Sequence, residues 1–502
     1  MTIRWLLPLL LLLGLAAPAR ADDISASARG VVRVVTIAVV DDEVVGFGHG
    51  SGFAVAPNRI VTNAHVVELA ARHPDNVVIG IVPSEGEKSF QGKVIAIDAA
   101  RDLALIEFEG ISLPPLALYT GPFDEGSSVT ALGYPGNVDL ATARSSADYI
   151  RPLSPIRSEG VFSGRRAMAD AQVLLHTAGI ARGNSGGPLL DPCGRVIGVN
   201  SALTRGEEGD TSFGFAIADV ELSTFLRAAG QPFAAVGTPC TSIADQLRQD
   251  NDAEAMAAAE ATRARNDAVA KAAEQRAAAL IKARDEAQRT RENFIALAAV
   301  LLAIAVLALG AAGFFELRGH RPAALWVAGG SALAFVAALA IFVTRPSGEP
   351  MLPPAASPIA PTVNSDAALG KLVCTVLPQR SRVTVSSLAD VNLDWQEDGC
   401  MNGRTQYAEN GSKWDRILVP SQDQTVSVLQ FDPATKLYTN TRYLLSSAQM
   451  DAARKIRSQV TVKTCVPDIA ARANLATQQA AIRAALPPLP NERIVYSCKS
   501  AP

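Results

Sequence analysis

The stretch Gly183–Pro188 reads GNSGGP and places Ser185 among three glycines. A backbone so rich in glycine can turn sharply, which exposes the hydroxyl and directs neighbouring N–H groups toward one point. A serine hydroxyl alone is a weak nucleophile, so it needs a base within hydrogen-bond reach and a carboxylate that orients this base. The stretch therefore predicts a nucleophilic serine whose partners come from elsewhere in the chain.

Two upstream runs offer these partners. His65 lies in the run TNAHVV, residues 62–67, and Asp102 opens the run DLALI, residues 102–106. Taken alone, the histidine would be interpreted as a core residue and the aspartate as the cap of a strand. The order His, Asp, Ser along the chain is one of the orders in which catalytic triads occur. We therefore predict that His65, Asp102 and Ser185 form such a triad.

The chain around these motifs has the pattern of an all-β domain. From Val31 to Ile217 it consists of short runs rich in β-forming residues, separated by turn residues. Such runs, without amphipathic helices between them, indicate a barrel or a sandwich. Between Asn137 and Ala171 the chain contains Pro152 and Pro155, and for this segment we expect long loops.

The three motifs resemble the catalytic blocks of trypsin-like serine peptidases, and most closely those of the bacterial HtrA/Deg branch. The runs GHGSGF at 48–53 and FGFAI at 213–217 extend the resemblance, which covers about residues 25–230. It implies two six-stranded barrels with the active site between them, the histidine and aspartate in the first and the serine in the second. It also implies polypeptide substrates. The PDZ-like Gly-Leu-Gly-Phe loop of that branch is missing, so peptide capture by a PDZ module is not implied.

The resemblance also implies a role for each residue of the site. Ser185 would attack the peptide carbonyl, His65 would take its proton and return it to the leaving amine, and Asp102 would hold the imidazole. The backbone N–H groups of Gly183 and Ser185 would form the oxyanion hole.

Two positions depart from the digestive trypsins. Asn184 precedes the serine where they have an aspartate, and the predicted mature start at Asp22 is not of the Ile-Val-Gly-Gly type. Activation by a new N-terminal ammonium is therefore not implied. The residue six positions before the serine is not acidic, so a preference for Arg or Lys at P1 is unsupported. We expect a pocket for small or medium apolar side chains, bordered by Gly179, Ile180, Gly198, Phe213, Gly214 and Phe215.

The N-terminus carries an export signal. Arg4 precedes an apolar run from Trp5 to Ala17, and Ala19-Arg20-Ala21 then gives a small-x-small cleavage pattern. We predict a signal peptide over residues 1–21 and a mature peptidase domain over 22–238. The apolar run is too short to span a bilayer comfortably, and an uncleaved anchor is the alternative.

A long helix and two apolar segments are predicted next. From 241 to 309 the chain has neither glycine nor proline, and Ala, Glu, Arg and Gln dominate its first part. A helical stalk is expected over 241–293, either solvated or in a coiled-coil homo-oligomer. The uncharged runs 294–315 and 323–343 each have the length of a membrane-spanning helix, and residues 316–322 would form the turn between them.

The charges of this turn predict the topology. Arg318 and Arg321 favour a cytoplasmic turn by the positive-inside rule, whereas Arg289 and Arg291 before the first span argue mildly for the opposite. With an exported peptidase domain, we predict a multi-pass inner-membrane protein whose peptidase and C-terminal domains are periplasmic. Membrane lipid is then a partner through the two helices.

A proline-rich segment introduces the C-terminal part. Residues 344–366 are expected to be an extended linker, because six prolines lie between positions 346 and 361. For residues 367–502 we predict a small α+β domain of unknown function, with β-like runs such as Thr425–Phe431 and a helix over Ser447–Ser458.

The six cysteines are scattered without a Cys-x-x-Cys pair, which indicates neither a zinc ribbon nor a thioredoxin-like site. We expect no metal and no cofactor. An even count in an exported chain fits disulfides. Cys193 and Cys240 can pair within the peptidase domain or remain free, and the four cysteines of the C-terminal domain allow three pairings.

Composition and motifs together rank the functions. A net charge of -3 gives no electrostatic footprint for nucleic acid. The leading interpretation is a membrane-anchored serine endopeptidase that acts on exported proteins. The alternative is a catalytically silent or latent peptidase fold that binds polypeptide and signals across the membrane. A channel or transporter has little support, because the two spans contain no ionisable residue.

Overall fold

The computed structural model describes residues 22–41, 43–168, 171–204, 212–346 and 370–501. The predicted signal peptide and most of the predicted linker lie outside these ranges. By their contacts, the described residues up to 250 and from 370 onward form one compact unit, and residues 251–346 belong to a second.

A closed six-stranded antiparallel barrel begins the first unit. Its strands follow the order β1-β2-β3-β6-β5-β4 around the ring. Alternate side chains of these strands point inward and fill the barrel with Val, Ile and Phe. The strands are β1 (Val31–Val40), β2 (Glu43–Ala56), β3 (Arg59–Thr62), β4 (Val77–Pro83), β5 (Phe90–Asp98) and β6 (Leu103–Phe108).

A second six-stranded ring follows in the same unit. Its order is β11-β8-β9-β10-β13-β12, and a pairing of β11 with β12 closes it. The short strands β7 (Leu118–Tyr119) and β14 (Ala235–Val236) extend its sheet beyond β12. The predicted pair of barrels is thus confirmed. The ring consists of β8 (Ser128–Gly133), β9 (Ile156–Met168), β10 (Ala171–His176), β11 (Pro188–Leu190), β12 (Val196–Leu203) and β13 (Gly214–Ala218).

The connection from β8 to β9 differs from the expected long loop. It contains the short helix α4 (Gly136–Thr142) and the 3-10 turn η1 (Ser146–Ile150). The second half of the segment is strand β9, which pairs with β8 and β10. The loop prediction is therefore wrong for this half, because Pro152 and Pro155 stand just before the strand and leave its ladder intact.

The two barrels share one hydrophobic core. Val31, Phe53 and Leu103 of the first barrel belong to the same buried cluster as Val173 and Ile217 of the second. Full burial of one such side chain contributes roughly 1.5–3 kcal/mol. The shared core fixes the barrels against each other, and with them the residues that each presents at the cleft.

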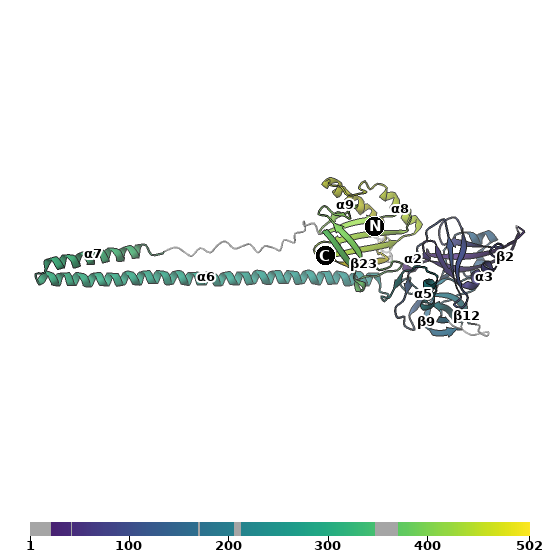
Figure 1. Ribbon diagram of the computed structural model, residues 1–502, viewed down its shortest axis with the longest axis horizontal. Coiled ribbons are helices and arrows are strands. Elements are labelled where there is room, and N and C mark those ends of the chain that lie inside the picture. The colour runs from purple at the N-terminus through teal and green to yellow at the C-terminus, as the bar shows by residue number, and fades with distance from the viewer. Residues whose placement is uncertain (1–21, 42, 169–170, 205–211, 347–369, 502) are drawn as a thin grey trace, which may run out of the picture. The chain divides into compact units, whose positions relative to one another are not determined.

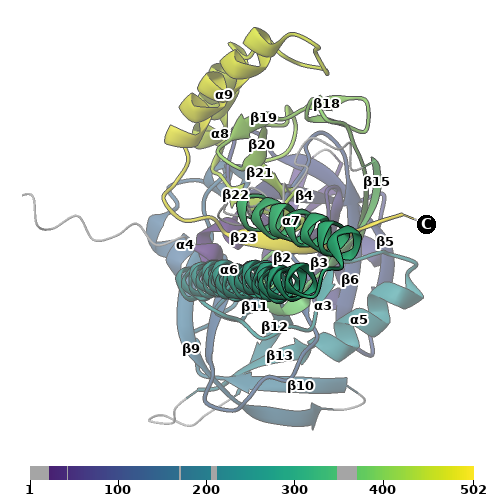
Figure 2. The ribbon, with the colours of Figure 1, turned by 90° about the vertical axis from the view of Figure 1, so that its left-hand side faces the viewer.

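Residues 370–501 form a nine-stranded sheet with the order β18-β17-β16-β15-β23-β22-β21-β20-β19. The helices α8 (Ser447–Arg457) and α9 (Ile469–Ala484) cover one face (Figures 1 and 2). The predicted helix corresponds to α8, and the sequence reasoning missed α9. The strands are β15 (Gly370–Val376), β16 (Val391–Trp395), β17 (Cys400–Met401), β18 (Thr405–Gln406), β19 (Ala408–Asn410), β20 (Lys413–Leu418), β21 (Thr425–Asp432), β22 (Leu437–Leu444) and β23 (Glu492–Ser500).

The other face of this sheet packs on the region of the two barrels. Ala117 and Val236 belong to the same buried cluster as Leu372, Phe431 and Tyr496 of the sheet. Side chains of β21 point alternately to the two faces of the sheet: Leu429 and Phe431 pack toward the barrels, and Val426 and Val428 pack toward the helices.

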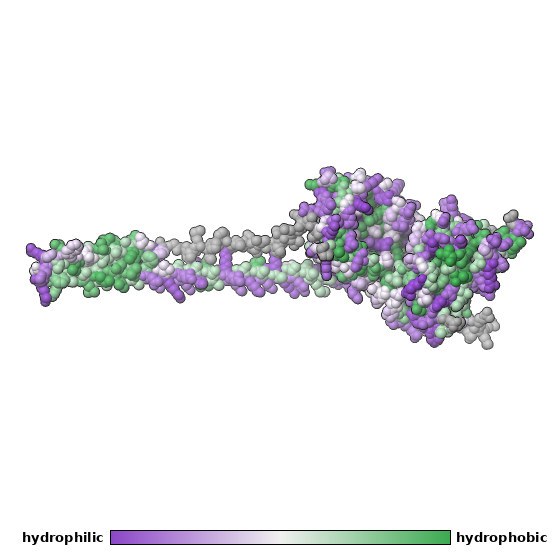
Figure 3. Space-filling model, viewed as in Figure 1, coloured by the Kyte–Doolittle hydropathy of each residue, from purple (hydrophilic) through white to green (hydrophobic). Residues whose placement is uncertain are grey.

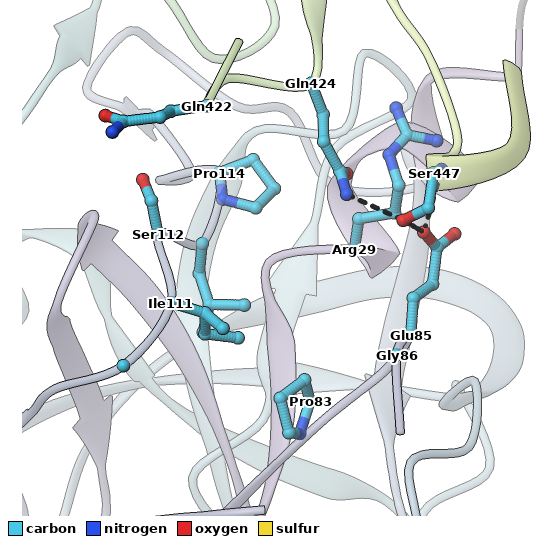
Figure 4. A pocket seen from close by; sticks show the side chains of 12 residues that line it. Arg29, Pro83, Glu85, Gly86, Ile111, Ser112, Pro114, Gln422, Gln424 and Ser447 are labelled. Carbon is cyan, nitrogen blue, oxygen red and sulfur yellow. Dashed lines mark hydrogen bonds between the residues drawn. The ribbon is translucent and has the colours of Figure 1, made fainter. Parts of the chain in front are cut away.

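Polar contacts support the same junction. The helix α2 (Asp23–Ala28) presents Asp23, which forms a buried ion pair with Arg382 and accepts a hydrogen bond from Asn491 at 3.0 Å. At another edge Glu85 accepts two hydrogen bonds from Ser447, and Figure 4 shows these residues at the border of a cavity of about 610 Å³.

Three disulfides join cysteines of this unit, which confirms the expectation of disulfides. Cys193 pairs with Cys240 in the peptidase region. In the C-terminal sheet Cys374 pairs with Cys498 across the neighbouring strands β15 and β23, and Cys400 pairs with Cys465.

The second unit is a helical hairpin of α6 (Ile243–Leu317) and α7 (Arg321–Val343), of which α6 starts in the first unit. Each helix contains a stretch that is long and apolar enough to cross a membrane. Figure 3 shows hydrophobic surface over α7 and the adjoining end of α6, while the preceding part of α6 is largely hydrophilic.

Small residues at intervals of seven mark the contact between the two helices. Their burial lets the backbones approach, and Ser331 donates a hydrogen bond to the carbonyl of Ala305 at 2.7 Å. Most large apolar side chains of both helices are exposed in the hairpin. The buried small residues are Ala298, Ala305, Ala312, Ala324, Ser331 and Ala338.

Candidate active site

His65 and Asp102 meet at the edge of the first barrel. His65 lies in the first turn of α3 (Ala64–Arg72), directly after β3, and Asp102 lies in the turn between β5 and β6. The imidazole Nδ1 is 2.9 Å from each carboxylate oxygen of Asp102, and the backbone N–H of His65 donates to Oδ1 at 3.1 Å. Asp102 has a φ of 53°, a left-handed conformation that aspartate tolerates better than most residues. The two predicted partners are therefore in direct contact.

Ser201, on β12, is a residue of this site that the sequence reasoning missed. Its hydroxyl donates to Oδ2 of Asp102 at 2.7 Å. No sequence signal distinguishes it from other serines within strands. Burial raises the pKa of the Asp102 carboxyl, but the hydrogen bonds from His65 and Ser201 outweigh it, and the pKa lies below its usual value. The hydrogen bond to Asp102, opposed by burial, raises the pKa of His65.

Ser185 lies next to the same residue of β12. Its hydroxyl donates to the backbone carbonyl of Ser201 at 3.0 Å. Both residues are described, and no hydrogen bond connects the Ser185 hydroxyl with His65. Ser201 thus contacts the aspartate through its side chain and the serine through its backbone, which brings all three predicted residues to one place without completing the relay between serine and histidine.

The backbone around Ser185 has a conformation that requires glycine. Gly183 has a φ of 99° and Gly186 a φ of 88°. A Cβ at Gly183 would lie 2.3 Å from the Tyr134 carbonyl oxygen, and one at Gly186 would lie 2.2 Å from the Ser51 carbonyl oxygen. No other residue type fits either position without displacing backbone.

Two N–H groups of this loop are available to a ligand. The carbonyl of Arg182 accepts a hydrogen bond from the N–H of Gly136 at 2.6 Å. Because C=O and N–H point in opposite directions across a trans peptide, the N–H of Gly183 faces away from Gly136. In the backbone hydrogen bonds of the described chain, neither Gly183 nor Ser185 donates. These are the two N–H groups that were predicted to hold an oxyanion.

Ser51 ties this loop to the first barrel. Its hydroxyl donates to the Gly183 carbonyl at 2.7 Å and accepts from the N–H of Tyr134 at 2.9 Å. Its backbone N–H donates to the Ser185 carbonyl at 2.8 Å. Ser51 belongs to the run GHGSGF, and through these contacts it holds the Gly183–Ser185 loop against β2.

The residues predicted to border a substrate pocket have different surroundings. A Cβ at Gly179 would meet no atom within 4 Å, so this position faces open space. Ile180 is partly buried against the core of the second barrel. A Cβ at Gly198 would lie 3.2 Å from Leu174, and one at Gly214 would lie 2.3 Å from His176, so both positions face neighbouring side chains.

The phenylalanines near Gly214 complete this set. Phe215 packs against the core shared by the barrels, and Phe213 is half-buried where the chain enters β13. Within the described ranges, no group of three or more His, Cys, Asp or Glu side chains is arranged to hold a metal ion.

Comparisons with known proteins find similarity in the region of the two barrels. Residues 50–199 match the family model described as a trypsin-like peptidase domain. The serine protease Rv3671c of Mycobacterium tuberculosis is 31% identical over 206 residues, which are 41% of this chain and 45% of that protein. A protein of Chlamydia pneumoniae named "Probable periplasmic serine endoprotease DegP-like" is 35% identical over 173 residues, 34% of this chain and 31% of that protein.

Among solved structures, the crystal structure of the M. tuberculosis Rv3671c protease in its active form is similar. The alignment covers 44% of this chain and 89% of that chain, with 23% identity and a TM-score of 0.34. The chain spans less than half the length of the two curated relatives described above. Residues 50–199 therefore form a trypsin-like peptidase domain, similar to the domains of HtrA/DegP-like serine proteases.

Proposed function

We propose that the chain is a membrane-anchored serine endopeptidase that hydrolyses peptide bonds of exported proteins. The observation that carries the proposal is the contact network in which Ser201 links Ser185 to an Asp102–His65 pair. In this proposal Ser185 attacks the peptide carbonyl, His65 takes the proton and later gives it to the leaving amine, and Asp102 stabilises the charged imidazole.

The first step requires the Ser185 hydroxyl to leave the Ser201 carbonyl. Rotation about its Cα–Cβ bond exchanges one hydrogen bond for another toward His65, and a single hydrogen bond contributes only about 0.5–1.5 kcal/mol. The side chain of His65 is 48% exposed, so the imidazole can adjust to an incoming substrate. The N–H groups of Gly183 and Ser185 then stabilise the oxyanion, and removal of one such donor typically costs about 100- to 1,000-fold in rate.

For the substrate, we propose polypeptides with small or medium apolar P1 side chains. Gly179 places no charge at the position that is acidic in trypsin-like enzymes with a basic preference. A peptide-library profile dominated by Arg or Lys at P1 would contradict this part of the proposal.

For the location, we propose the cell inner membrane, with the peptidase and C-terminal regions on the periplasmic side. The outward apolar surface of α6 and α7 supports burial in lipid, since lipid would cover side chains that are exposed to water otherwise. Protease accessibility in spheroplasts tests this arrangement, and protection of the peptidase region there would contradict it.

The domain boundaries remain part of the same proposal. They are a signal peptide at 1–21, the peptidase domain at 22–238, the stalk at 241–293, the spans 294–315 and 323–343 around a turn at 316–322, a linker at 344–366 and the C-terminal domain at 367–502. N-terminal sequencing of the purified protein tests the first boundary, for which we expect Asp22 as the first residue.

A second candidate function is a latent or silent peptidase fold that binds polypeptide and signals across the membrane. The bond from the Ser185 hydroxyl to the Ser201 carbonyl favours it, because this bond occupies the proton that the relay would use. Labelling of the purified full-length protein with a fluorophosphonate distinguishes the two. We expect labelling that Ser185→Ala abolishes, whereas an unlabelled but polypeptide-binding wild type would favour the silent fold.

A further inference from the structure

The orientation of the Arg182–Gly183 peptide depends on the start of helix α4. The N–H of Gly136, the first residue of α4, donates to the Arg182 carbonyl at 2.6 Å. Gly183 is also tightly packed against the same neighbours, because a Cβ there would lie 2.7 Å from His49 Nε2 and 3.0 Å from the Gly136 nitrogen. Any displacement of α4 therefore changes the direction of the Gly183 N–H.

Helix α4 has little that holds it in place. Asp139 is its one buried residue, while Leu140 is 80% exposed. Its N-cap, Pro135, contributes no side-chain hydrogen bond to the helix. Since a helix of seven residues has almost no stability of its own, its position relies on the contacts of Asp139.

Asp139 connects α4 to the first barrel. Its Oδ1 accepts a hydrogen bond from Arg33 Nη2 at 2.7 Å, and both side chains are buried. Its Oδ2 is 3.2 Å from His49 Nε2, which is also 3.2 Å from the Tyr134 carbonyl oxygen. The Tyr134 carbonyl next to this nitrogen places the proton of the neutral imidazole on Nε2, so that His49 donates to Tyr134. Asp139 Oδ2 lies close to the same nitrogen but forms no hydrogen bond among the described residues.

Arg33 and His49 lie on the part of the first barrel that faces the Gly183 loop. Arg33 lies opposite Ser51 in the β1–β2 ladder, and His49 lies two residues before Ser51 on the same face of β2. His49 and Ser51 both contact the Gly183 loop, while the guanidinium of Arg33 also donates to the carbonyl of Tyr149 at 3.0 Å. One face of β2 thus supports the loop directly, and Asp139 completes the support through α4.

The residue before the nucleophile does not supply this support. Asn184 is buried, and its Oδ1 has no hydrogen-bond partner in the part of the chain that the structure describes. An amide at this position carries no charge and forms no ion pair. The buried Arg33–Asp139 pair is the charged contact that lies next to the loop.

We propose that Asp139, together with Arg33 and His49, is a positioning residue that holds the Arg182–Gly183 peptide with its N–H directed at the reacting carbonyl. The inference rests on the proposed peptidase function and extends it to residues outside the triad. Loss of Asp139 leaves Arg33 as an unpaired buried charge, which displaces α4 and with it the hydrogen bond from Gly136.

The test compares Asp139→Ala and Asp139→Asn in the full-length protein in detergent micelles. A misdirected oxyanion donor weakens transition-state stabilisation while leaving substrate binding intact. For Asp139→Ala we expect kcat to fall roughly 10- to 100-fold with KM changed less than about twofold, and for Asp139→Asn a smaller loss, since the amide retains an acceptor for Arg33. We also expect faster hydrogen–deuterium exchange in residues 181–187.

A matched control is Asp415→Asn in the C-terminal sheet. Asp415 is buried and paired with Arg483 at 2.7 Å, the same distance as in the Arg33–Asp139 pair. This variant should lower the thermal midpoint without changing kcat or exchange in residues 181–187. Because the side chain of Arg483 is 45% exposed, this variant separates loss of a buried carboxylate that pairs with an arginine from loss of support for the loop.

The outcomes separate this inference from the proposed function. Wild-type kcat and exchange in a folded Asp139→Ala protein would overturn the positioning role, and so would equal loss of kcat in the Asp415→Asn control. If Asp139→Ala does not fold, the same criteria apply to Asp139→Asn. If the wild type itself shows no activity that depends on Ser185, the proposed function fails, and hydrogen–deuterium exchange alone then decides whether Asp139 holds the loop.

Discussion

Replacement of His176 by leucine should remove a pH dependence of stability. His176 ends β10, is fully buried and lies against Gly214 of the neighbouring strand. Burial lowers the pKa of the imidazole from 6.5 to about 4. Neither ring nitrogen forms a well-aligned hydrogen bond among the described residues, and the nearby Asn200 side chain and Ala178 backbone offset the effect of burial only in part. An apolar side chain of similar size therefore loses little hydrogen bonding there.

The pKa difference sets the sign and the size of the effect. The folded-state pKa lies below the unfolded-state value, so the unfolded chain takes up the proton first as the pH falls. The contribution of His176 is fully present above pH 6.5 and is lost as the pH falls toward 4. A difference of about 2.5 pKa units, at about 1.4 kcal/mol each, corresponds to roughly 3 kcal/mol.

Urea unfolding of the full-length protein, followed by far-UV circular dichroism at several pH values, measures this contribution. Both the reference and the His176→Leu protein should carry Ser185→Ala, which prevents self-cleavage during the experiment. We expect similar stability at pH 7.5 and a loss between pH 7 and 4 that is smaller in His176→Leu by about 3 kcal/mol. Parallel pH profiles for the two proteins would refute the reasoning.

Three further predictions concern catalysis. The hydrogen bond to Asp102 raises the pKa of His65, so in a plot of kcat/KM against pH the rise on the acid side, or acid limb, should have its midpoint above pH 6.5. Activity should appear as the pH rises through this limb. A midpoint below pH 6 in stopped assays would contradict this. Ser201→Ala should lower kcat/KM about tenfold and move the limb to higher pH, because an Asp102 carboxylate without this donor holds the charged imidazole more strongly; Ser201→Thr, which keeps the hydroxyl, should retain most activity in the same assay. Gly183→Ala should slow fluorophosphonate labelling at least about 100-fold, because the added Cβ meets the Tyr134 carbonyl. Gly80→Ala in β4, where a Cβ makes only ordinary contacts, serves as the control. Equal labelling rates in the two variants would argue against the oxyanion role of Gly183.

The barrels and the closeness of His65, Asp102 and Ser185 could be predicted because their signals are local. The GNSGGP stretch requires positive φ at Gly183, and the alternating β-rich runs indicate strands whatever their partners. Ser201 and Asp139 carry no such signal. Their roles depend on which strand or helix lies beside which, and that register appears only when the barrels are closed.

The C-terminal helix α9 shows the same limit in another form. Its buried face consists of Leu475, Gln479 and Ile482, spaced as a helix requires but with a polar residue in the middle. Gln479 accepts a hydrogen bond from the N–H of Ile417 on β20, and this contact accounts for its burial. An apolar stripe interrupted in this way does not stand out in an alanine-rich sequence.

The position of β23 in the C-terminal sheet constrains how the chain reaches its folded state. This strand, Glu492–Ser500, lies between β15 and β22, so the sheet cannot be assembled until a segment more than a hundred residues after β15 has been synthesised. Until then Ala117 and Val236 lack the side chains of the sheet that bury them, and the carboxylate of Asp23 lacks its partners Arg382 and Asn491. A peptidase region produced without the C-terminal sheet would expose this apolar surface and leave the Asp23 carboxylate unpaired. Its native structure is therefore complete only after the whole chain has been synthesised and folded.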